Sequence, residues 1–166
     1  MSEACPGETI RQSEYSPGVV GDDETIVYVL FDPEQWQDGQ LSVGAFTNED
    51  LKKTRLSVAR REYTTEAVAK AQVVGPRVAG GQKFVGGLRA KCVELRRLSS
   101  EDGSRLFCVL DDGLPGHPGH AVIGYSEAKR DQYFAQRNPK SDRVAIRQKL
   151  AVAFGVTPLS LSDSFR

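Results

Sequence analysis

The chain has 166 residues, of which 39% are hydrophobic and 27% are charged, a balance typical of one globular domain with its own core. No apolar run reaches the roughly 18 residues that a membrane span needs, and the first residues lack the basic start and apolar core of a secretory signal. The 22 basic and 22 acidic residues cancel overall, but the first 50 residues hold eleven acidic residues and one basic residue. The remainder therefore carries the excess of basic residues, an asymmetry that bears on partners and not on the fold.

The first segment, residues 1–23, is rich in Ser, Glu, Gly and Pro and poor in large apolar side chains. Such a segment cannot bury enough apolar surface to offset its ordering entropy, so we predict a mobile acidic arm. Residues 24–155 are predicted to form a single domain, and residues 156–166 a C-terminal tail without a clear period.

The first half of the domain opens with an apolar, β-branched and aromatic run, which predicts a strand buried on both faces. Thr47 and either Thr64 or Thr65 are good N-caps for two short helices, the second of which should end at Gly75 and Pro76. The segment Leu56–Tyr63 is ambiguous between a strand and an irregular link. The elements expected here are strands at 25–31 and 41–46, helices at 48–54 and 65–74, and a glycine-rich loop at 75–87.

The second half returns to β patterning and then to helical patterning. An alternating run whose phase slips at Val93 predicts a strand with one bulged residue. The expected elements are strands at 88–98, 105–110 and 120–125, followed by helices at 127–137 and 143–154. Runs of strands and runs of helices, without strict alternation, favour an α+β domain with a mixed or antiparallel sheet and an antiparallel meander at about 88–125.

The loop that begins "DDGLPGHPGH" gathers Asp111, Asp112 and both histidines of the chain, His117 and His120. If the flanking segments pair as antiparallel strands, the carboxylates and His120 meet at the mouth of the hairpin. A structural role for His120, acid–base chemistry by His120 with Asp111 or Asp112, and a metal site built from all four residues are the three alternatives. We take His120, Asp111 and Asp112 as candidate catalytic residues and expect no metal or cofactor, because no ligand or cofactor motif stands out.

The three cysteines, Cys5, Cys92 and Cys108, are odd in number and share no C-x-x-C spacing. This argues against a zinc ribbon and against a disulfide framework, and it favours a reducing, cytoplasmic location.

Basic residues recur on predicted outer faces, and Arg143 and Arg147 lie one helical turn apart. Arg60, Arg61, Arg143 and Arg147 are therefore candidate binding residues. A protein partner is the favoured interpretation and a nucleic acid the second, while no membrane partner and no particular oligomeric state is indicated.

Two stretches, "AFTNEDLKKTRLSVARREYTT" and "RLFCVLDDGLPGHPGHAVIGY", together resemble a family of small bacterial proteins of unassigned function. In that family an "LSV" phrase with a nearby Arg precedes a D-x-LP-x-x-P-x-HA-x-I segment, and the resemblance covers about residues 24–125. It implies that His120 and the Leu56–Arg60 segment belong to one recurring arrangement. An Asn commonly stands in the family where this chain has His117, which departs from a two-histidine metal site.

From these features the sequence predicts a small cytoplasmic binding or accessory protein, and a bacterial multi-gene system is the expected setting. It would engage a macromolecular partner through its basic surface and the 111–120 loop. The alternative is a hydrolase or toxin-like nuclease that uses His120 with Asp111 or Asp112. The sequence pattern is compatible with both an enzyme and a binding protein.

Overall fold

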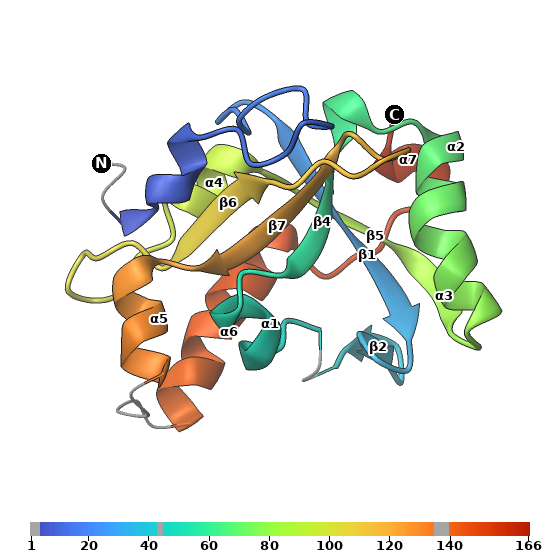
Figure 1. Ribbon diagram of the computed structural model, residues 1–166. Helices are drawn as coiled ribbons and strands as arrows, with labels where there is room; N and C mark the ends of the chain where they lie inside the picture. The colour runs from blue at the N-terminus through green and yellow to red at the C-terminus, as the bar shows by residue number, and fades with distance from the viewer. Residues whose placement is uncertain (1–3, 43–44, 135–139) are drawn as a thin grey trace.

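The computed structural model describes residues 4–42, 45–134 and 140–166, and the side chains of all these residues except 133–134 and 140–143. Its centre is a five-stranded antiparallel sheet in the order β5-β1-β4-β7-β6 (Figure 1). The strands are β1 (Thr25–Asp32), β4 (Leu56–Arg60), β5 (Lys83–Lys91), β6 (Phe107–Asp111) and β7 (His120–Tyr125). A separate two-stranded ribbon pairs β2 (Trp36–Gln37) with β3 (Gln40–Leu41). The predicted α+β class with a single domain is confirmed.

The larger hydrophobic core lies on one face of this sheet. Alternate residues of β1, namely Ile26, Tyr28 and Leu30, point into it and are at most 5% exposed. Helices α1 (Asn48–Lys52), α4 (Cys92–Arg96) and α6 (Lys140–Phe154) contribute apolar side chains to this core. Helix α5 (Glu127–Phe134) packs beside β7 (Figure 1). None of the described helices combines the length and the apolar character needed to cross a membrane.

The opposite face carries a smaller apolar cluster, formed by Val27, Val29 and Phe31. One continuous helical stretch packs on it, made of α2 (Glu66–Ala69), the π-helical turn η4 (Lys70–Val74) and α3 (Gly75–Ala79). The C-terminal segment also covers this face: α7 (Leu161–Ser164) packs on β5, and the ring of Phe165 packs on the smaller cluster. Leu159 and Gly87 exchange two backbone hydrogen bonds of 2.9 Å, so the tail also covers the edge strand β5.

Two predictions in the first half are wrong. The second helix does not end at Gly75, because Pro76 falls in the first turn of α3, where a missing backbone N–H costs nothing. The expected glycine-rich loop is thereby shortened, and β5 begins at Lys83. The strand predicted at 41–46 is reduced to β3, which ends at Leu41; residues 43–44 of that prediction lie outside the described residues.

The strand predicted at 88–98 is also wrong beyond Lys91, since the chain turns there into helix α4. Cys92 and Leu95 are both fully buried at a spacing of three residues, which is helical. The phase slip that suggested a bulge is the point where the spacing of buried residues changes from the two-residue period of a strand to the 3.6-residue period of a helix. Of the expected meander only the β6–β7 hairpin forms, because β5 pairs with β1 at the opposite edge of the sheet.

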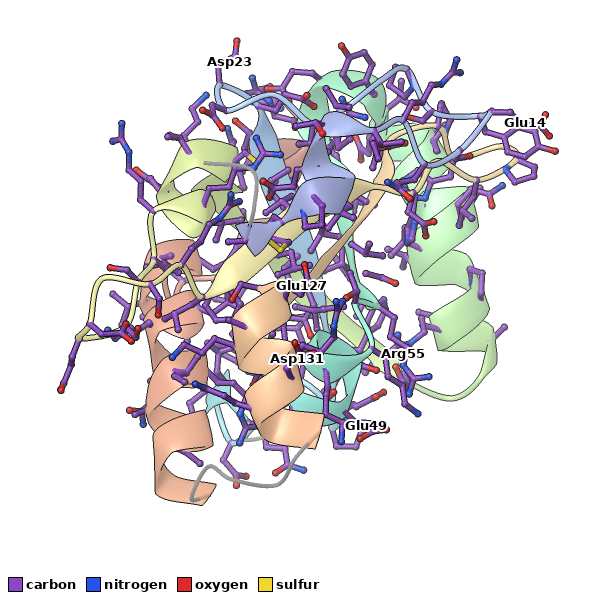
Figure 2. All side chains as sticks on the ribbon, turned by 60° about the vertical axis from the view of Figure 1, so that its left-hand side comes forward. Glu14, Asp23, Glu49, Arg55, Glu127 and Asp131 are labelled. Carbon is purple, nitrogen blue, oxygen red and sulfur yellow. A yellow bond between two sulfur atoms is a disulfide. The ribbon has the colours of Figure 1, made fainter. Side chains whose placement is uncertain are left out.

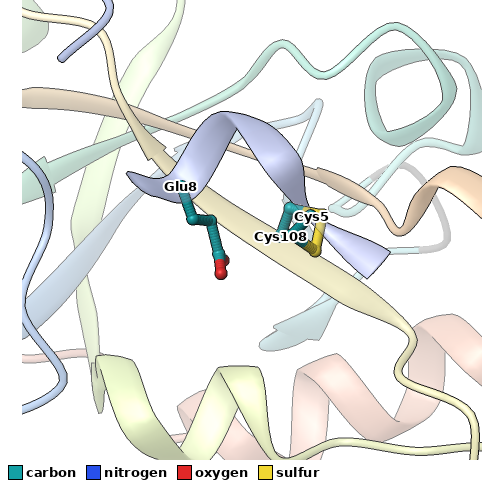
Figure 3. A group of neighbouring side chains, drawn as sticks. All are labelled: Cys5, Glu8 and Cys108. Atoms are coloured by element: carbon teal, nitrogen blue, oxygen red, sulfur yellow. A yellow bond between two sulfur atoms is a disulfide. The ribbon is translucent and has the colours of Figure 1, made fainter. Parts of the chain in front are cut away.

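The N-terminal segment, residues 4–24, packs on the domain in place of the expected mobile arm. Its 3-10 turn η2 (Pro6–Thr9) lies along β6, and a disulfide joins Cys5 to Cys108 across a sequence separation of 103 residues (Figure 3). Cys5 and Val20 are 2% and 3% exposed. The expectation of no disulfide, drawn from the odd number of cysteines, is therefore wrong, and burial of the remaining Cys92 raises the pKa of its thiol to about 12.

Buried ion pairs explain why so polar a segment is ordered. Glu8, with a side chain only 8% exposed, bonds to Arg96 at 3.1 Å and also to Arg105, and it accepts the backbone N–H of Val109 at 2.7 Å. Asp22 adds a second contact to Arg96 at 2.7 Å. The acidic start of the chain thus neutralises basic residues of the domain, while Glu14 and Asp23 point outward (Figure 2).

Cys5→Ser is expected to lower the free energy of unfolding by about 4–5 kcal/mol under oxidising conditions, because the disulfide closes a loop of 103 residues. Urea denaturation measures the difference. In excess reductant the two proteins should agree to within about 1 kcal/mol. Equal stability without reductant would show that the disulfide does not hold the N-terminal segment.

Candidate functional site

The two ends of the 111–120 loop meet, because β6 and β7 are adjacent antiparallel strands that pair Asp111 with Ala121. Within the loop, Leu114 and His117 exchange two backbone hydrogen bonds of 2.9 Å. Gly116 lies between them with φ of +76°, a conformation that favours glycine. The loop is therefore a hydrogen-bonded turn that holds both histidines in fixed positions.

His120 is held by Asp112. Its Nδ1 lies 2.9 Å from the backbone carbonyl oxygen of Asp112 and 3.0 Å from Oδ2 of the same residue. Both of these atoms are acceptors, so we assign the ring proton to Nδ1, which leaves Nε2 of the neutral imidazole as an acceptor. The predicted carboxylate–imidazole contact is present, and Asp112 is the residue that makes it.

Asp111 does not belong to this contact. Both of its carboxylate oxygens accept the backbone N–H of Gln12, each at 3.0 Å, and the residue is 2% exposed. Successive residues of a strand project to opposite faces, so Asp111 and Asp112 cannot both face His120. The placement of Asp111 beside His120 is therefore corrected: this carboxylate anchors the N-terminal segment.

His117 lies edge-on to His120, with ring centroids 5.5 Å apart and the ring planes at 67°. It is 2% exposed, and its Nε2 has no hydrogen-bond partner among the described residues. Burial, with a smaller effect from His120, lowers the pKa of His117 to about 4. His117 is therefore an uncharged neighbour of His120 at neutral pH.

The four residues of the metal alternative do not meet at one point, since Asp111 faces away from the histidines. Within the described part of the chain, only Cys5, Glu8 and Cys108 bring three potential ligand atoms together (Figure 3). The two sulfur atoms of that group are joined in the disulfide and cannot act as thiolate ligands.

Arg60, predicted to bind a ligand, is instead an internal residue that is 1% exposed. Its guanidinium pairs with Glu24 through distances of 2.7 and 2.8 Å and donates to the carbonyl oxygens of Gly18 and Val19 at 2.7 and 3.1 Å. The aromatic ring of Tyr63 lies 4.6 Å from the guanidinium carbon. Arg60 therefore fixes the N-terminal segment against the sheet, and its predicted binding role is corrected.

The other predicted arginines do not gather into one surface. Arg61, in the 3-10 turn η3 (Arg61–Tyr63), donates to the carbonyl oxygen of Arg166 at 2.9 Å and to Glu62 at 3.2 Å. Arg147 lies on α6, on the other side of the sheet, and donates to the carbonyl oxygen of Phe46 at 3.2 Å. The side chain of Arg143 lies outside the described residues.

A groove lies beside the two histidines, on the face of the sheet that carries the smaller apolar cluster. We call it the sheet groove; its volume is about 130 Å³. Val27, Val29, Ser57 and Ala59, which alternate along β1 and β4, line its floor. His117 and His120 line the end at which Ala59 pairs with His120.

The far end of the sheet groove carries two ion pairs, Asp50–Arg55 at 2.9 Å and Glu34–Arg77 at 2.8 Å. Arg55 projects to the surface there (Figure 2).

The sequence analysis missed the residues of this floor. Ser57 is the one that a sequence could have indicated, because it is a polar residue between the apolar Leu56 and Val58 and so predicts an open position on one face of a strand. The partners of that face come from β1 and β7, which are distant in sequence, and no local pattern identifies them.

Comparison with protein-family models finds no match to the chain, and searches of curated proteins and of solved structures find none either. The geometry of the site is therefore what bears on the function.

The stability of the protein should fall as the pH falls from about 6.5 to about 4, by up to roughly 3 kcal/mol from His117. In this range the unfolded chain binds a proton that the buried imidazole does not accept. Urea denaturation at pH 7 and pH 4 measures the change. His117→Asn, which cannot be protonated, should remove that part of the loss; an unchanged pH slope would contradict the assignment.

Arg60→Ala is expected to cost about 3–5 kcal/mol of stability, because it leaves Glu24 buried without its counter-ion. Arg61→Ala is the matched control and should cost less than about 1 kcal/mol, since its ion pair with Glu62 is partly exposed. Urea denaturation of both variants compares them. Equal losses would mean that the Glu24 pair does not hold the segment.

Proposed function

We propose that the protein is a small binding or accessory protein that takes a short segment of a macromolecular partner into the sheet groove. The observation that carries the proposal is the opening over the central strand β4, where Ser57 is exposed although its neighbours Leu56 and Val58 are buried. Elsewhere this face is covered, by the N-terminal segment at β6 and by the helical and C-terminal segments at β1 and β5. An uncovered, partly apolar hollow on an otherwise covered face is typical of a ligand site.

The charges around the groove favour a protein partner over a nucleic acid. Each guanidinium at the far end already has a carboxylate partner, Asp50 for Arg55 and Glu34 for Arg77. The rim therefore offers no excess of positive charge to a phosphate backbone. The floor is apolar, which suits one or two side chains of an extended peptide. Both edges of the sheet are covered, so the peptide would lie on the sheet face and not add a strand.

The expected setting, a cytoplasmic protein of a bacterial multi-gene system, belongs to this proposal. It rests on the composition and on the resemblance described above. The disulfide is the feature of the structure that weighs against a reducing compartment.

A second candidate function is that of a hydrolase or toxin-like nuclease with His120 as acid–base. The observation that favours it is the pair of contacts from Nδ1 to Asp112, which fixes the tautomer and leaves Nε2 free to accept a proton. Of the two predicted orienting residues, only Asp112 contacts the ring.

Ser57→Trp is expected to fill the sheet groove and weaken partner binding at least tenfold, because the side chain at 57 points into the groove. The partner is first identified by a photo-crosslinking amino acid at position 57 in cells, and its Kd is then measured by titration. Val152→Trp is the control, since Val152 is 80% exposed on α6, away from the groove. An unchanged Kd for a folded Ser57→Trp protein would overturn the proposal.

A further inference from the structure

We propose that Ser57, His120 and Asp112 form a nucleophile, a general base and an orienting carboxylate, and that they give the sheet groove an esterase activity toward short apolar acyl esters. The inference rests on the proposed function only in that the groove must admit a ligand. Ser57 would be the nucleophile, which no motif of the sequence indicates.

The topology places the three residues in one row. β6, β7 and β4 are consecutive strands of the sheet, and His120 pairs with Ala59 while Val122 pairs with Ser57. Ser57 is therefore the diagonal neighbour of His120 on the same face, a relation that puts Cα atoms roughly 7–8 Å apart and Cβ atoms closer. Asp112 stands on the other side of His120, where its N–H donates to the His120 carbonyl oxygen at 3.1 Å.

The local pairing places the small Ala59 directly opposite His120. Arg60 donates its backbone N–H to the carbonyl oxygen of Gly119 at 2.8 Å, so the next pair along the ladder, Ala59 with His120, is a non-hydrogen-bonded pair. Ser57 and Val122 form the following pair of the same type. Directly opposite side chains approach each other more closely at such pairs. The opposite partner of His120 is alanine, so no bulky β4 side chain stands between the imidazole and Ser57.

Both reacting groups are available. Ser57 is exposed in the groove, and neither its hydroxyl nor Nε2 of His120 has a hydrogen-bond partner among the described residues. Asp112 holds Nδ1 at 2.9 and 3.0 Å, which directs the basic nitrogen away from Asp112 and toward the groove that His120 lines. A base oriented by a third group, near an unengaged hydroxyl, is the arrangement that activates a serine.

The groove also indicates the substrate. Val29 and Val73 line the groove with apolar side chains, and its volume of about 130 Å³ favours a short acyl chain over a long one. Arg55 directly precedes β4, two residues before Ser57; its Nε bonds to Asp50, and its Nη groups make no hydrogen bond to a described residue. These Nη donors are the groups that would stabilise an oxyanion.

The reaction is an ordinary acyl transfer to water. Oγ of Ser57 attacks the ester carbonyl carbon as its proton passes to Nε2 of His120, and the carbonyl π pair moves onto oxygen. Collapse of this intermediate breaks the bond to the alcohol, which takes the proton from Nε2 and leaves an acyl-serine. Water then repeats the sequence: it gives a proton to Nε2, its oxygen bonds to the acyl carbon, and the carboxylic acid leaves as Ser57 recovers its proton.

The test is covalent labelling of the full chain with a fluorophosphonate probe, with hydrolysis of p-nitrophenyl butyrate as the second readout. We expect one label, located at Ser57 by peptide mass spectrometry, and loss of label and turnover in Ser57→Ala. Ser162→Ala, which changes a serine of α7, should label normally. His120→Gln should slow labelling by at least 100-fold.

Asp112 acts through His120, so it is a positioning residue. Asp112→Ala keeps the backbone carbonyl contact to Nδ1 and should lower kcat by about 10- to 100-fold with an unchanged KM, whereas a collapsed loop would raise KM as well. Thermal unfolding of every variant confirms that it is folded.

The failures of the two proposals are distinguishable. A wild-type protein that is neither labelled nor hydrolytic, or a label that persists in Ser57→Ala, overturns the esterase. If Ser57→Trp still blocks the partner in that case, the binding proposal stands. A label at Ser57 together with normal partner binding by Ser57→Trp overturns the binding proposal instead.

Discussion

The buried ion pair between Arg60 and Glu24 is the interaction on which the position of the N-terminal segment depends. Arg60 belongs to the central strand β4, so its guanidinium cannot reach bulk water. Such a pair adds little net stability compared with apolar residues of the same size, but leaving one partner alone is costly. The pair therefore selects one position for the N-terminal segment, which its apolar content alone could not fix.

The sheet groove results from how the sheet face with the smaller apolar cluster is covered. The N-terminal segment reaches β6, where the disulfide and Glu8 hold it, and the helical stretch of α2, η4 and α3 packs on β1 and β5. Neither covers Ser57 on β4 or fully covers His120 at the start of β7, although Ala59 and Val122 beside them are buried. A sheet face in this position is normally apolar, and here the uncovered positions are Ser57 and His120, whose polar groups remain in contact with solvent.

The elements that could be predicted from the sequence are those governed by local rules. The strand at β1 follows from its β-branched and aromatic run, and the caps of α1 and α2 are confirmed by Thr47 and Thr65, whose hydroxyls accept N–H groups at 3.2 and 3.1 Å. The errors arise where a distant contact decides. The order of the N-terminal segment and the Cys5–Cys108 bond both depend on pairings across about one hundred residues, which spacing patterns do not encode.

The hairpin mouth was predictable in outline, because the loop joins two adjacent strands, but the choice between neighbouring aspartates was not. That choice depends on the strand register, because a shift of one residue moves a side chain to the opposite face of the sheet. Asp112 therefore faces the imidazole, and Asp111 faces Gln12. Without the strand register, both were equal candidates.

The two histidines lie side by side but have different surroundings. His117 is buried without a partner for its Nε2 among the described residues, whereas His120 is held by Asp112. Burial keeps His117 uncharged at neutral pH, so it neither competes for Asp112 nor repels a proton that arrives on His120. Its ring also excludes water from one side of His120, and a hydrogen bond is electrostatically stronger where water is excluded. A proton accepted at Nε2 is then stabilised through the contact of Nδ1 with the Asp112 carboxylate. Asp112, His120 and Ser57 therefore follow one another across the sheet, from the loop to the floor of the sheet groove.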